Sequence, residues 1–298
     1  MNLNTPSTLT NLAVQERTRR EILHRSDLIR PLPEMVVRLL GMLNDGNSEP
    51  ADIEKHLQVD QVLVAKLLGM VNSPFYGLSR QVRSIREAIV VLGFRGLRSL
   101  LLASSTAKFL DRDLGGYGHD QHGLLKHSFC VASAARSLAQ FTHQGQDLSE
   151  ELFIAGLLHD IGKMLLAPYL LQHHLDPHQV ATAIVATECA TIGIDHTEAG
   201  ALVAAKWNLS PLVQEVIKHH HDDETPQIHK TAFALVRLAD ALAHERRIGY
   251  QQDCVPETVF FPQDLRTLGL TAQDWARARE VMDEAMSGAV SSMQSLLH

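Results

Sequence analysis

A histidine and an aspartate stand side by side within an otherwise apolar stretch of the chain. Residues 153–175 read FIAGLLHDIGKMLLAPYLLQHHL, with His159 and Asp160 near the centre of the first half. Burying two ionisable side chains without partners would cost several kcal/mol. Imidazole nitrogens and carboxylate oxygens are both metal ligands, so one bound divalent ion would satisfy the two side chains together. The pair therefore predicts a metal site.

Other segments with helical periodicity also turn a ligand-type side chain toward their apolar face. In each segment the polar residue lies three, four or seven positions from apolar residues, which places it on the inward side. These residues are His127, His196, His220 and Asp240. A single inward histidine is most often a core residue bonded to a backbone carbonyl, but an unpaired inward aspartate is rare. A shared metal site explains all of these residues together, and the alternative is a helical scaffold in which each has its own partner.

The expected centre has one or two metal positions. Adjacent helical residues point about 100° apart, so His159 and Asp160 can bind one ion, or Asp160 can bridge two. We expect His127, His159, Asp160 and Asp240 to converge, with His196, His220 and His221 completing a second position. The ligands offer nitrogen and oxygen and no thiolate, which favours iron or manganese and also allows zinc or nickel.

Lys163, one turn after Asp160, is a second candidate catalytic residue beside Asp160 itself. If the site is catalytic, metal ions would neutralise phosphoryl oxygens and activate water, while Lys163 held the phosphate or assisted the leaving group. The alternative is a solvated lysine at a helix end, where the helix dipole favours a cation. His173 and His174 are expected on a solvated turn outside the site.

Composition limits the possible functions. The 298 residues carry a net charge of -7 and no long Lys/Arg run, which argues against a broad nucleic-acid footprint. The three cysteines show no metal-binding or disulfide spacing and suit a reducing compartment. The first residues lack a signal-peptide core, and no apolar run reaches about 18 residues, so a cytoplasmic protein is expected.

The periodicity along the chain is helical throughout, and the predicted fold class is all-α with two helical lobes. Helices are expected at 33–45, 50–58, 60–71, 84–93, 95–110, 124–141, 149–161, 178–192, 196–207, 211–221, 229–246 and 272–297. The glycine-rich stretch 111–123 is the best candidate for a domain boundary. We therefore predict a tail at 1–19, an N-terminal lobe at 20–112, a metal-site lobe at 119–246, and a C-terminal extension at 247–298 whose first part, 247–265, is irregular.

The order of these residues resembles a known superfamily. His127, the His159–Asp160 pair and Asp240 match the H…HD…D pattern of the HD superfamily of metal-dependent phosphohydrolases, and LLHDIGK with the later histidines is similar to its HD-GYP subgroup. The whole of residues 30–245 resembles the HDOD (HD-related output domain) family more closely, through LPEMVVRLLGMLND, VDQVLVAKLLGMVNSPFYG, SIREAIVVLGFRGLRSLLL, HSFCVASAARSLA, AGLLHDIGK, DHTEAGALVAAKWNLSPLVQEVIKHHH and ALVRLADALAH.

The resemblance implies a bacterial, all-helical signalling or regulatory protein. HDOD proteins have mostly lost several HD ligands, whereas this chain keeps them, and it carries HHHDDETPQ where HD-GYP enzymes have their G-Y-P segment. We expect a regulatory HDOD protein that keeps a metal site and acts through protein contacts. The alternative is a phosphohydrolase acting on a nucleotide or cyclic dinucleotide. The expected partner is a signalling protein or a nucleotide-type ligand, neither membrane nor nucleic acid is expected, and a homodimer is left open.

The two inward carboxylates predict how the protein depends on its metal. Without a metal, Asp160 and Asp240 would face each other as like charges in a low-dielectric site. The metal-free protein should then be less stable, and added metal should raise its melting temperature. Asp160→Asn should then weaken metal binding sharply, and it should cost the metal-free protein little or even stabilise it by relieving the repulsion.

Overall fold

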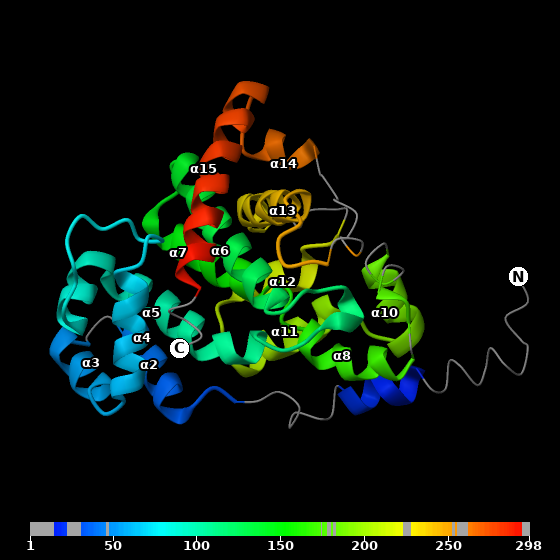
Figure 1. Cartoon of the computed structure of the whole chain (residues 1–298), viewed down its shortest axis with the longest axis horizontal. Coiled ribbons are helices and arrows are strands. Elements are labelled where there is room, and N and C mark those ends of the chain that lie inside the picture. The colour runs from blue at the N-terminus through cyan, green and yellow to red at the C-terminus, as the bar shows by residue number, and fades with distance from the viewer. Residues whose placement is uncertain are drawn as a thin grey trace, which may run out of the picture.

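The computed structural model is all-α, as the sequence predicts (Figure 1). It describes residues 15–22, 31–45, 48–173, 175–177, 180, 183–222, 228–251, 254 and 262–293. Within these ranges there is no β-strand, and the one β-type contact is an isolated bridge between His119 and Tyr250. The helices are α2 (Glu34–Asn44), α3 (Pro50–Leu57), α4 (Gln61–Val71), α5 (Ile85–Leu110), α6 (Gly123–Phe141), α7 (Gln146–Leu158), α8 (Lys163–Gln172), α10 (Ile184–Ile192), α11 (His196–Lys206), α12 (Pro211–His219), α13 (Lys230–Glu245), α14 (Pro262–Thr267) and α15 (Ala272–Ser292).

Helix α5 contains the break that the sequence predicts. Two helices were expected on either side of Gly93, and the structure has one element kinked at that residue, whose φ is 71°. A side chain other than glycine would be strained in this left-handed backbone conformation. The kink directs the second half of α5 toward α7, which it contacts.

Local side-chain caps define several helix starts. The Asp60 carboxylate accepts a hydrogen bond from the Leu63 N–H, and Ser84 caps α5 in the same way. Asp195 accepts from the backbone N–H of Glu198, which fixes the start of α11 directly at the candidate ligand His196. Such caps satisfy N–H groups that have no partner within the helix.

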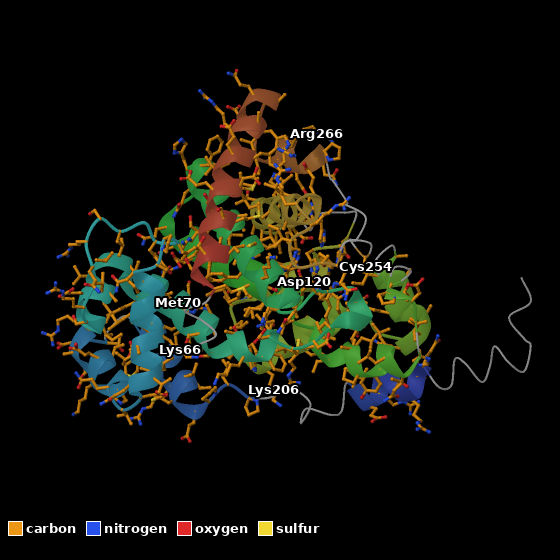
Figure 2. All side chains as sticks on the ribbon, viewed as in Figure 1. Lys66, Met70, Asp120, Lys206, Cys254 and Arg266 are labelled. Carbon is orange, nitrogen blue, oxygen red and sulfur yellow. The ribbon has the colours of Figure 1, made fainter. Side chains whose placement is uncertain are left out.

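Helices α2 to α5 form one group, α7 and α13 pack on α6, and α8 packs with α10 and α11 (Figure 1). The C-terminal helix α15 packs along α6 and buries Ala278, Met282, Met286 and Ala289. One continuous cluster of buried apolar residues includes members from α2 to α5 and from the later helices. Figure 2 shows the side chains that fill the space between the ribbons.

Four expectations from the sequence need correction. Residues 15–22 are helical, although a tail was predicted through residue 19. Helix α8 was not predicted from the sequence, and α14 begins inside the segment 247–265 that was expected to be irregular. Helix α15 ends at Ser292, while residues 294–297 of the predicted helix lie outside the described residues, as do 178, 179, 181 and 182 of the helix predicted at 178–192.

Two helical stretches are long and apolar enough, by length and composition, to cross a membrane: Ile85–Leu110 and Gln146–Gln172. The expectation that no segment reaches this length therefore does not hold by these criteria. Their apolar windows are 61% and 83% buried inside the protein. Packing within the helical core accounts for their hydrophobicity.

Candidate metal centre

The structure brings all the predicted ligands together. His127 lies on α6, His159 and Asp160 follow α7, His196 opens α11, and Asp240 lies on α13. The adjacent residues His220 and His221 follow α12. The side chains from these five places form overlapping groups whose ligand atoms lie within 4.8 Å of one another. His173 is exposed and outside these groups, and His174 lies outside the described residues.

One group of atoms forms what we call position A. The Nε2 atom of His127 is 3.0 Å from Asp240 Oδ1 and 3.8 Å from Asp160 Oδ2. His159 Nε2 is 3.4 Å from Asp160 Oδ2 and 3.6 Å from Asp240 Oδ1. Two imidazoles and two carboxylates therefore face one another here.

The second group, position B, lies on the other side of Asp160. Asp160 Oδ1 is 3.4 Å from His196 Nε2 and 3.8 Å from His220 Nε2. His221 Nε2 is 3.1 Å from His196 Nε2, which completes the group. The two oxygens of one buried carboxylate thus face different sets of histidines, the arrangement that a bridging ligand requires.

The hydrogen bonding of the histidines suits metal ligation. A carbonyl oxygen accepts only, so His159 Nδ1–H donates to Gly156 O at 2.8 Å and His220 Nδ1–H donates to Ile217 O at 2.8 Å. In its neutral form each ring then presents a bare Nε2 atom to the centre. The buried atoms without a hydrogen-bond partner include five at the centre: His127 Nε2, His159 Nε2, His220 Nε2, Asp160 Oδ1 and Asp240 Oδ1. A divalent metal would satisfy these atoms, so the donor set fits the expected ion.

Close backbone packing at two glycines holds these ligands in place. A Cβ atom on Gly162, two residues after Asp160, would come within 1.9 Å of the His196 carbonyl oxygen. A Cβ atom on Gly156 would come within 2.9 Å of the backbone of Ala132 on α6. Only glycine allows these approaches, which bring the His159–Asp160 turn against α11 and α7 against α6.

Lys163 belongs to the centre. Its Nζ atom lies 2.5 Å from Asp160 Oδ2, and the residue is only 2% exposed. The alternative prediction, a solvated lysine at a helix end, is therefore wrong. A buried ammonium beside a carboxylate partly compensates the cost of burying both charges.

Burial and neighbouring charges shift the pKa values within the centre. Burial by itself would lower the pKa of His159, but the Asp160 and Asp240 carboxylates raise it to about 10. Burial lowers the pKa of His220 to about 3. Burial would raise the pKa of Asp160, yet His159 and Lys163 hold it well below its usual range. In the metal-free protein His159 therefore carries a proton, which a metal ion would have to displace.

The carboxylate that supports His196 was not predicted from the sequence. Glu188, on α10, is fully buried, and its Oε2 atom accepts from both the Nδ1–H and the backbone N–H of His196, at 2.7 and 2.9 Å. The Tyr117 hydroxyl donates to the other oxygen at 2.7 Å. A carboxylate in this place fixes the ring orientation and makes Nε2 a stronger ligand. Its only sequence signal was a glutamate eight residues before a candidate ligand, which by itself is uninformative.

A wall of polar residues beside position A was also missed. His244 lies four residues after Asp240, and its ring is nearly parallel to the His127 ring, with 4.8 Å between the ring centroids. The Nε2 atom of His244 is 3.7 Å from Asp240 Oδ1. The Tyr250 hydroxyl is 3.2 Å from His244 Nε2, and the Tyr250 ring stacks on His119. The spacing of His244 on the same helical face as Asp240 could have identified it, but nothing in the sequence relates His119 to Tyr250.

Replacing Glu188 should weaken metal binding mainly at position B. In Glu188→Gln the carboxylate charge is lost while the side-chain shape is retained, so His196 becomes a weaker ligand. We expect metal affinity to fall by about 10- to 100-fold for one of two ions. Isothermal titration of metal-depleted protein with Mn²⁺, after removal of the chelator, measures this affinity. The matched control is Glu280→Gln, which changes an exposed glutamate on α15. Equal loss in the control variant, or an unchanged affinity in Glu188→Gln, would contradict the assignment.

Comparison with protein families gives a match to the HDOD domain over residues 29–223. An uncharacterized protein of Treponema pallidum (strain Nichols) is 26% identical over 293 residues, 91% of this chain and 54% of that protein. Ribonuclease Y of Bacillus subtilis (strain 168) is 28% identical over 248 residues, 82% of this chain and 38% of that protein. This chain therefore spans about half or less of the length of these curated relatives.

Solved structures with similar folds cover nearly the whole chain. A proposed phosphohydrolase from Shewanella amazonensis SB2B superposes with a TM-score of 0.68 at 23% identity, over 93% of this chain and 98% of that one. A proposed signal transduction protein from Marinobacter aquaeolei VT8 gives a TM-score of 0.70 at 19% identity, over 97% of this chain and 67% of that one. At these identities the likeness establishes the shared helical fold.

Proposed function

This chain belongs to the HDOD domain family, and we propose that it is a regulatory protein built around a two-ion centre of the HD type. The observation that carries the proposal is the orientation of Asp160. Its Oδ2 atom faces His127 and His159, while its Oδ1 atom faces His196 and His220. The proposed signal transduction protein that shares the fold supports a regulatory role. We also propose that the protein acts in the cytoplasm, a location with which the burial of its two long apolar helical stretches is compatible.

The donor atoms support a proposal for the metal. Position A offers two carboxylates with His127 and His159, and position B offers one carboxylate oxygen with three imidazoles. Mixed nitrogen and oxygen ligands without thiolate favour iron or manganese, and zinc or nickel would also be accepted. His127 and His196 are completely buried, so the ions would lie inside the protein and add to its stability.

Metal analysis tests this proposal directly. Protein purified without chelator or nickel resin should contain up to two equivalents of iron or manganese per chain. The variant His159→Ala should lose metal, because it removes a ligand of position A. The variant His173→Ala should not, because His173 is exposed and outside the centre. Wild-type protein without metal, even after incubation with Fe²⁺ or Mn²⁺, would refute the two-ion centre.

A specific contact favours phosphate-ester hydrolysis as a second candidate function. Lys163 is buried with its ammonium 2.5 Å from Asp160, where it could contact a phosphoryl oxygen or a leaving group. When bound, the metal ions would supply the Lewis acidity that such a reaction needs. This chain's own residues would hold the ions and, through Lys163, bind the phosphoryl group.

The same metal-loaded preparations distinguish the two functions. The regulatory proposal expects no turnover of bis(p-nitrophenyl) phosphate, nucleotides or cyclic dinucleotides. Turnover by wild type that is lost in Lys163→Met, with the metal content retained, would replace it with a phosphohydrolase. Because metal content is measured on every sample, a protein that simply lost its ions would be recognised.

A further inference from the structure

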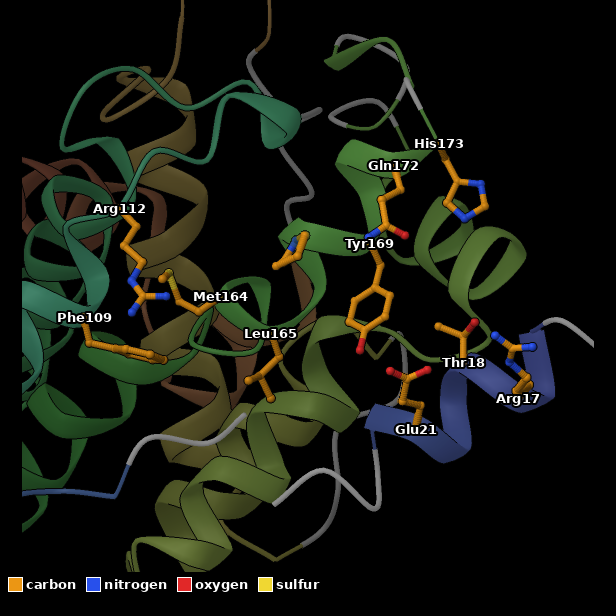
Figure 3. Close-up of a pocket in the computed structure, with 11 residues that line it drawn as sticks. Arg17, Thr18, Glu21, Phe109, Arg112, Met164, Leu165, Tyr169, Gln172 and His173 are labelled. Carbon is orange, nitrogen blue, oxygen red and sulfur yellow. The ribbon is translucent and has the colours of Figure 1, made fainter. Parts of the chain in front are cut away.

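A pocket away from the metal centre lies between the helix of residues 15–22, the end of α5 and α8 (Figure 3). Its volume is about 460 Å³, within the range of small-molecule sites. Figure 3 shows Phe109 and Arg112 on one side, Tyr169 in the middle, and Arg17 with Glu21 on the N-terminal helix opposite. No residue of this pocket is a ligand in either metal position.

The charges around the pocket favour an anion. Arg17 and Arg112 are both exposed, and within the described residues neither forms an ion pair. Glu21 is the one acidic residue among those that line the pocket, and it lies on the side opposite Arg112 (Figure 3). Two guanidinium groups on a chain of net charge -7 make this a locally basic site. Guanidinium groups match the geometry of phosphate oxygens.

Arg112 is held in place for such a contact. Its guanidinium carbon lies 5.3 Å from the centroid of the Phe109 ring, a cation–π contact. Phe109 in turn packs edge-on against Trp207, with 6.3 Å between ring centroids. The platform under the guanidinium is therefore a pair of partly buried rings packed against the core, which lowers the entropy lost when Arg112 binds a ligand.

The rest of the lining favours a flat apolar group. Met164, Leu165 and Pro168 supply apolar surface from α8, and the Tyr169 ring projects into the pocket from the same helix (Figure 3). Tyr169 lines the pocket and is partly exposed, so part of its ring surface can contact a ligand. Nucleobases stack on such aromatic rings.

We propose that this pocket binds a nucleotide, with its phosphate at Arg112 and its base against Tyr169. Arg17 adds positive charge from the opposite side. The site also has a direct connection to the metal centre. Met164 and Leu165 follow Lys163 in the first turn of α8, and Lys163 contacts Asp160. A nucleotide that packs on this turn therefore changes the freedom of Lys163, which makes the pocket an input site for the regulatory role.

Binding is tested in the presence of chelator, so that the metal centre cannot bind phosphate and the result is independent of the proposed function. Isothermal titration with GMP and with AMP should show saturable binding of at least one of them at one site per chain. Arg112→Ala should weaken it by at least about tenfold, the value of a charged hydrogen bond. Arg80→Ala removes an exposed arginine outside the pocket and should leave affinity unchanged. Circular dichroism checks that each variant is folded.

Separate probes test the two halves of the ligand. Inorganic phosphate and guanosine or adenosine should each bind more weakly than the nucleotide, and Tyr169→Ala should affect the nucleosides more than phosphate. The proposal is overturned by the absence of saturable nucleotide binding, or by binding that Arg112→Ala leaves intact. Phosphate that binds as tightly as the nucleotides would make this a simple anion site and would also overturn it.

The connection to the metal centre has its own measurement. Binding free energies are reciprocal, so a nucleotide that alters the centre must bind with a different affinity once metal is present. Titration of Mn²⁺-loaded protein should change the dissociation constant by about fivefold or more, in either direction. The heat that the nucleotide still releases with Mn²⁺-loaded Arg112→Ala is subtracted from the wild-type heat, which removes the contribution of any nucleotide bound at the metal ions. An unchanged constant would show that the pocket is not an input to the centre.

Discussion

Asp160→Asn should lower the stability of the metal-free protein and should also abolish the rise in melting temperature that added metal causes. The sequence predicts little effect without metal, because the aspartates were expected to repel each other. In the structure Asp160 instead has Lys163 at 2.5 Å and His159 at 3.4 Å. Removing one partner of such a buried pair leaves the other charge uncompensated, at a cost of about 3–5 kcal/mol. For a chain of this length the melting temperature should fall by roughly 5–15 °C.

Added metal should separate the variant from the wild type further. An ion present at about 100 times its dissociation constant stabilises the folded state by about 2.7 kcal/mol. Wild type should gain this stability, whereas Asp160→Asn should gain almost none, because both positions lose a shared ligand. Thermal melts of both proteins, with chelator and with Mn²⁺ or Fe²⁺, measure the four values.

The double variant Asp160→Asn/Lys163→Met is the control for the metal-free effect. Removing both charges should recover much of the stability lost in the single variant, because no ammonium is left uncompensated. If Asp160→Asn and wild type have the same melting temperature in the presence of chelator, repulsion between the two aspartates would be the better description of the metal-free centre. If added metal raised the melting temperatures of wild type and Asp160→Asn equally, the ion would have to bind away from Asp160.

Two of the ligands, His127 and Asp240, were predictable because each lies on a helix with a clear apolar face. The positions of His127 on α6 and Asp240 on α13 follow from a period of 3.6 residues, which fixes the inward direction without knowledge of the neighbours. The fold class follows from the same periodicity. Whether these faces meet depends on helix packing, which no local pattern determines.

The missed helix α8 lacked that signal. Its sequence, KMLLAPYLLQ, is apolar on nearly all sides and contains Pro168, which lowers helix propensity. The helix is nevertheless formed, because Leu166 and Leu170 are buried in the core. Here tertiary packing outweighs local preference.

The glycine-rich stretch 111–123 shows a different limit. It was predicted as a domain boundary, which stays a prediction, and in the structure its residue His119 lies beside position A, with 6.3 Å between the His119 and His127 ring centroids. Its Gly123 packs so closely on Gly249 that a Cβ atom on Gly123 would lie 2.2 Å from the Gly249 carbonyl oxygen. This approach, with the bridge between His119 and Tyr250, joins two segments far apart in sequence. A contact of this kind leaves no trace in composition or periodicity.

A second large loss of stability is expected when the ion pair between α13 and α14 is removed. Arg237 donates from Nε to Asp264 Oδ2 at 2.9 Å and from Nη2 to Oδ1 at 2.5 Å, and both side chains are almost completely buried. Its Nη1 donates to the carbonyl of Asp222 at 3.0 Å, directly after the candidate ligand His221. The pair therefore stabilises the fold and also positions one edge of position B.

Arg237→Met should cost about 3–5 kcal/mol of unfolding free energy at pH 7, because it leaves the buried Asp264 carboxylate without its counter-charge. Burial already raises the pKa of Asp264, and Arg237 only partly offsets this. Without Arg237 the pKa of Asp264 in the folded protein should rise further. Between the pKa of the unfolded chain, near 3.9, and this raised value, Asp264 is then protonated in the folded protein and ionised in the unfolded chain. The penalty is then fully present at neutral pH and shrinks as the pH falls through the raised pKa and Asp264 becomes neutral.

Urea unfolding at pH 7 and at about pH 4.5 measures both the penalty and its pH dependence. The matched control is Arg246→Met, since Arg246 pairs with Asp283 at 2.7 Å on an exposed surface. Exposed pairs contribute about 0.2–1 kcal/mol, so this variant should differ little from wild type. Equal costs for the two variants would show that the buried pair adds nothing specific. A penalty for Arg237→Met that stays the same at both pH values would show that the loss comes from packing and not from the uncompensated charge of Asp264.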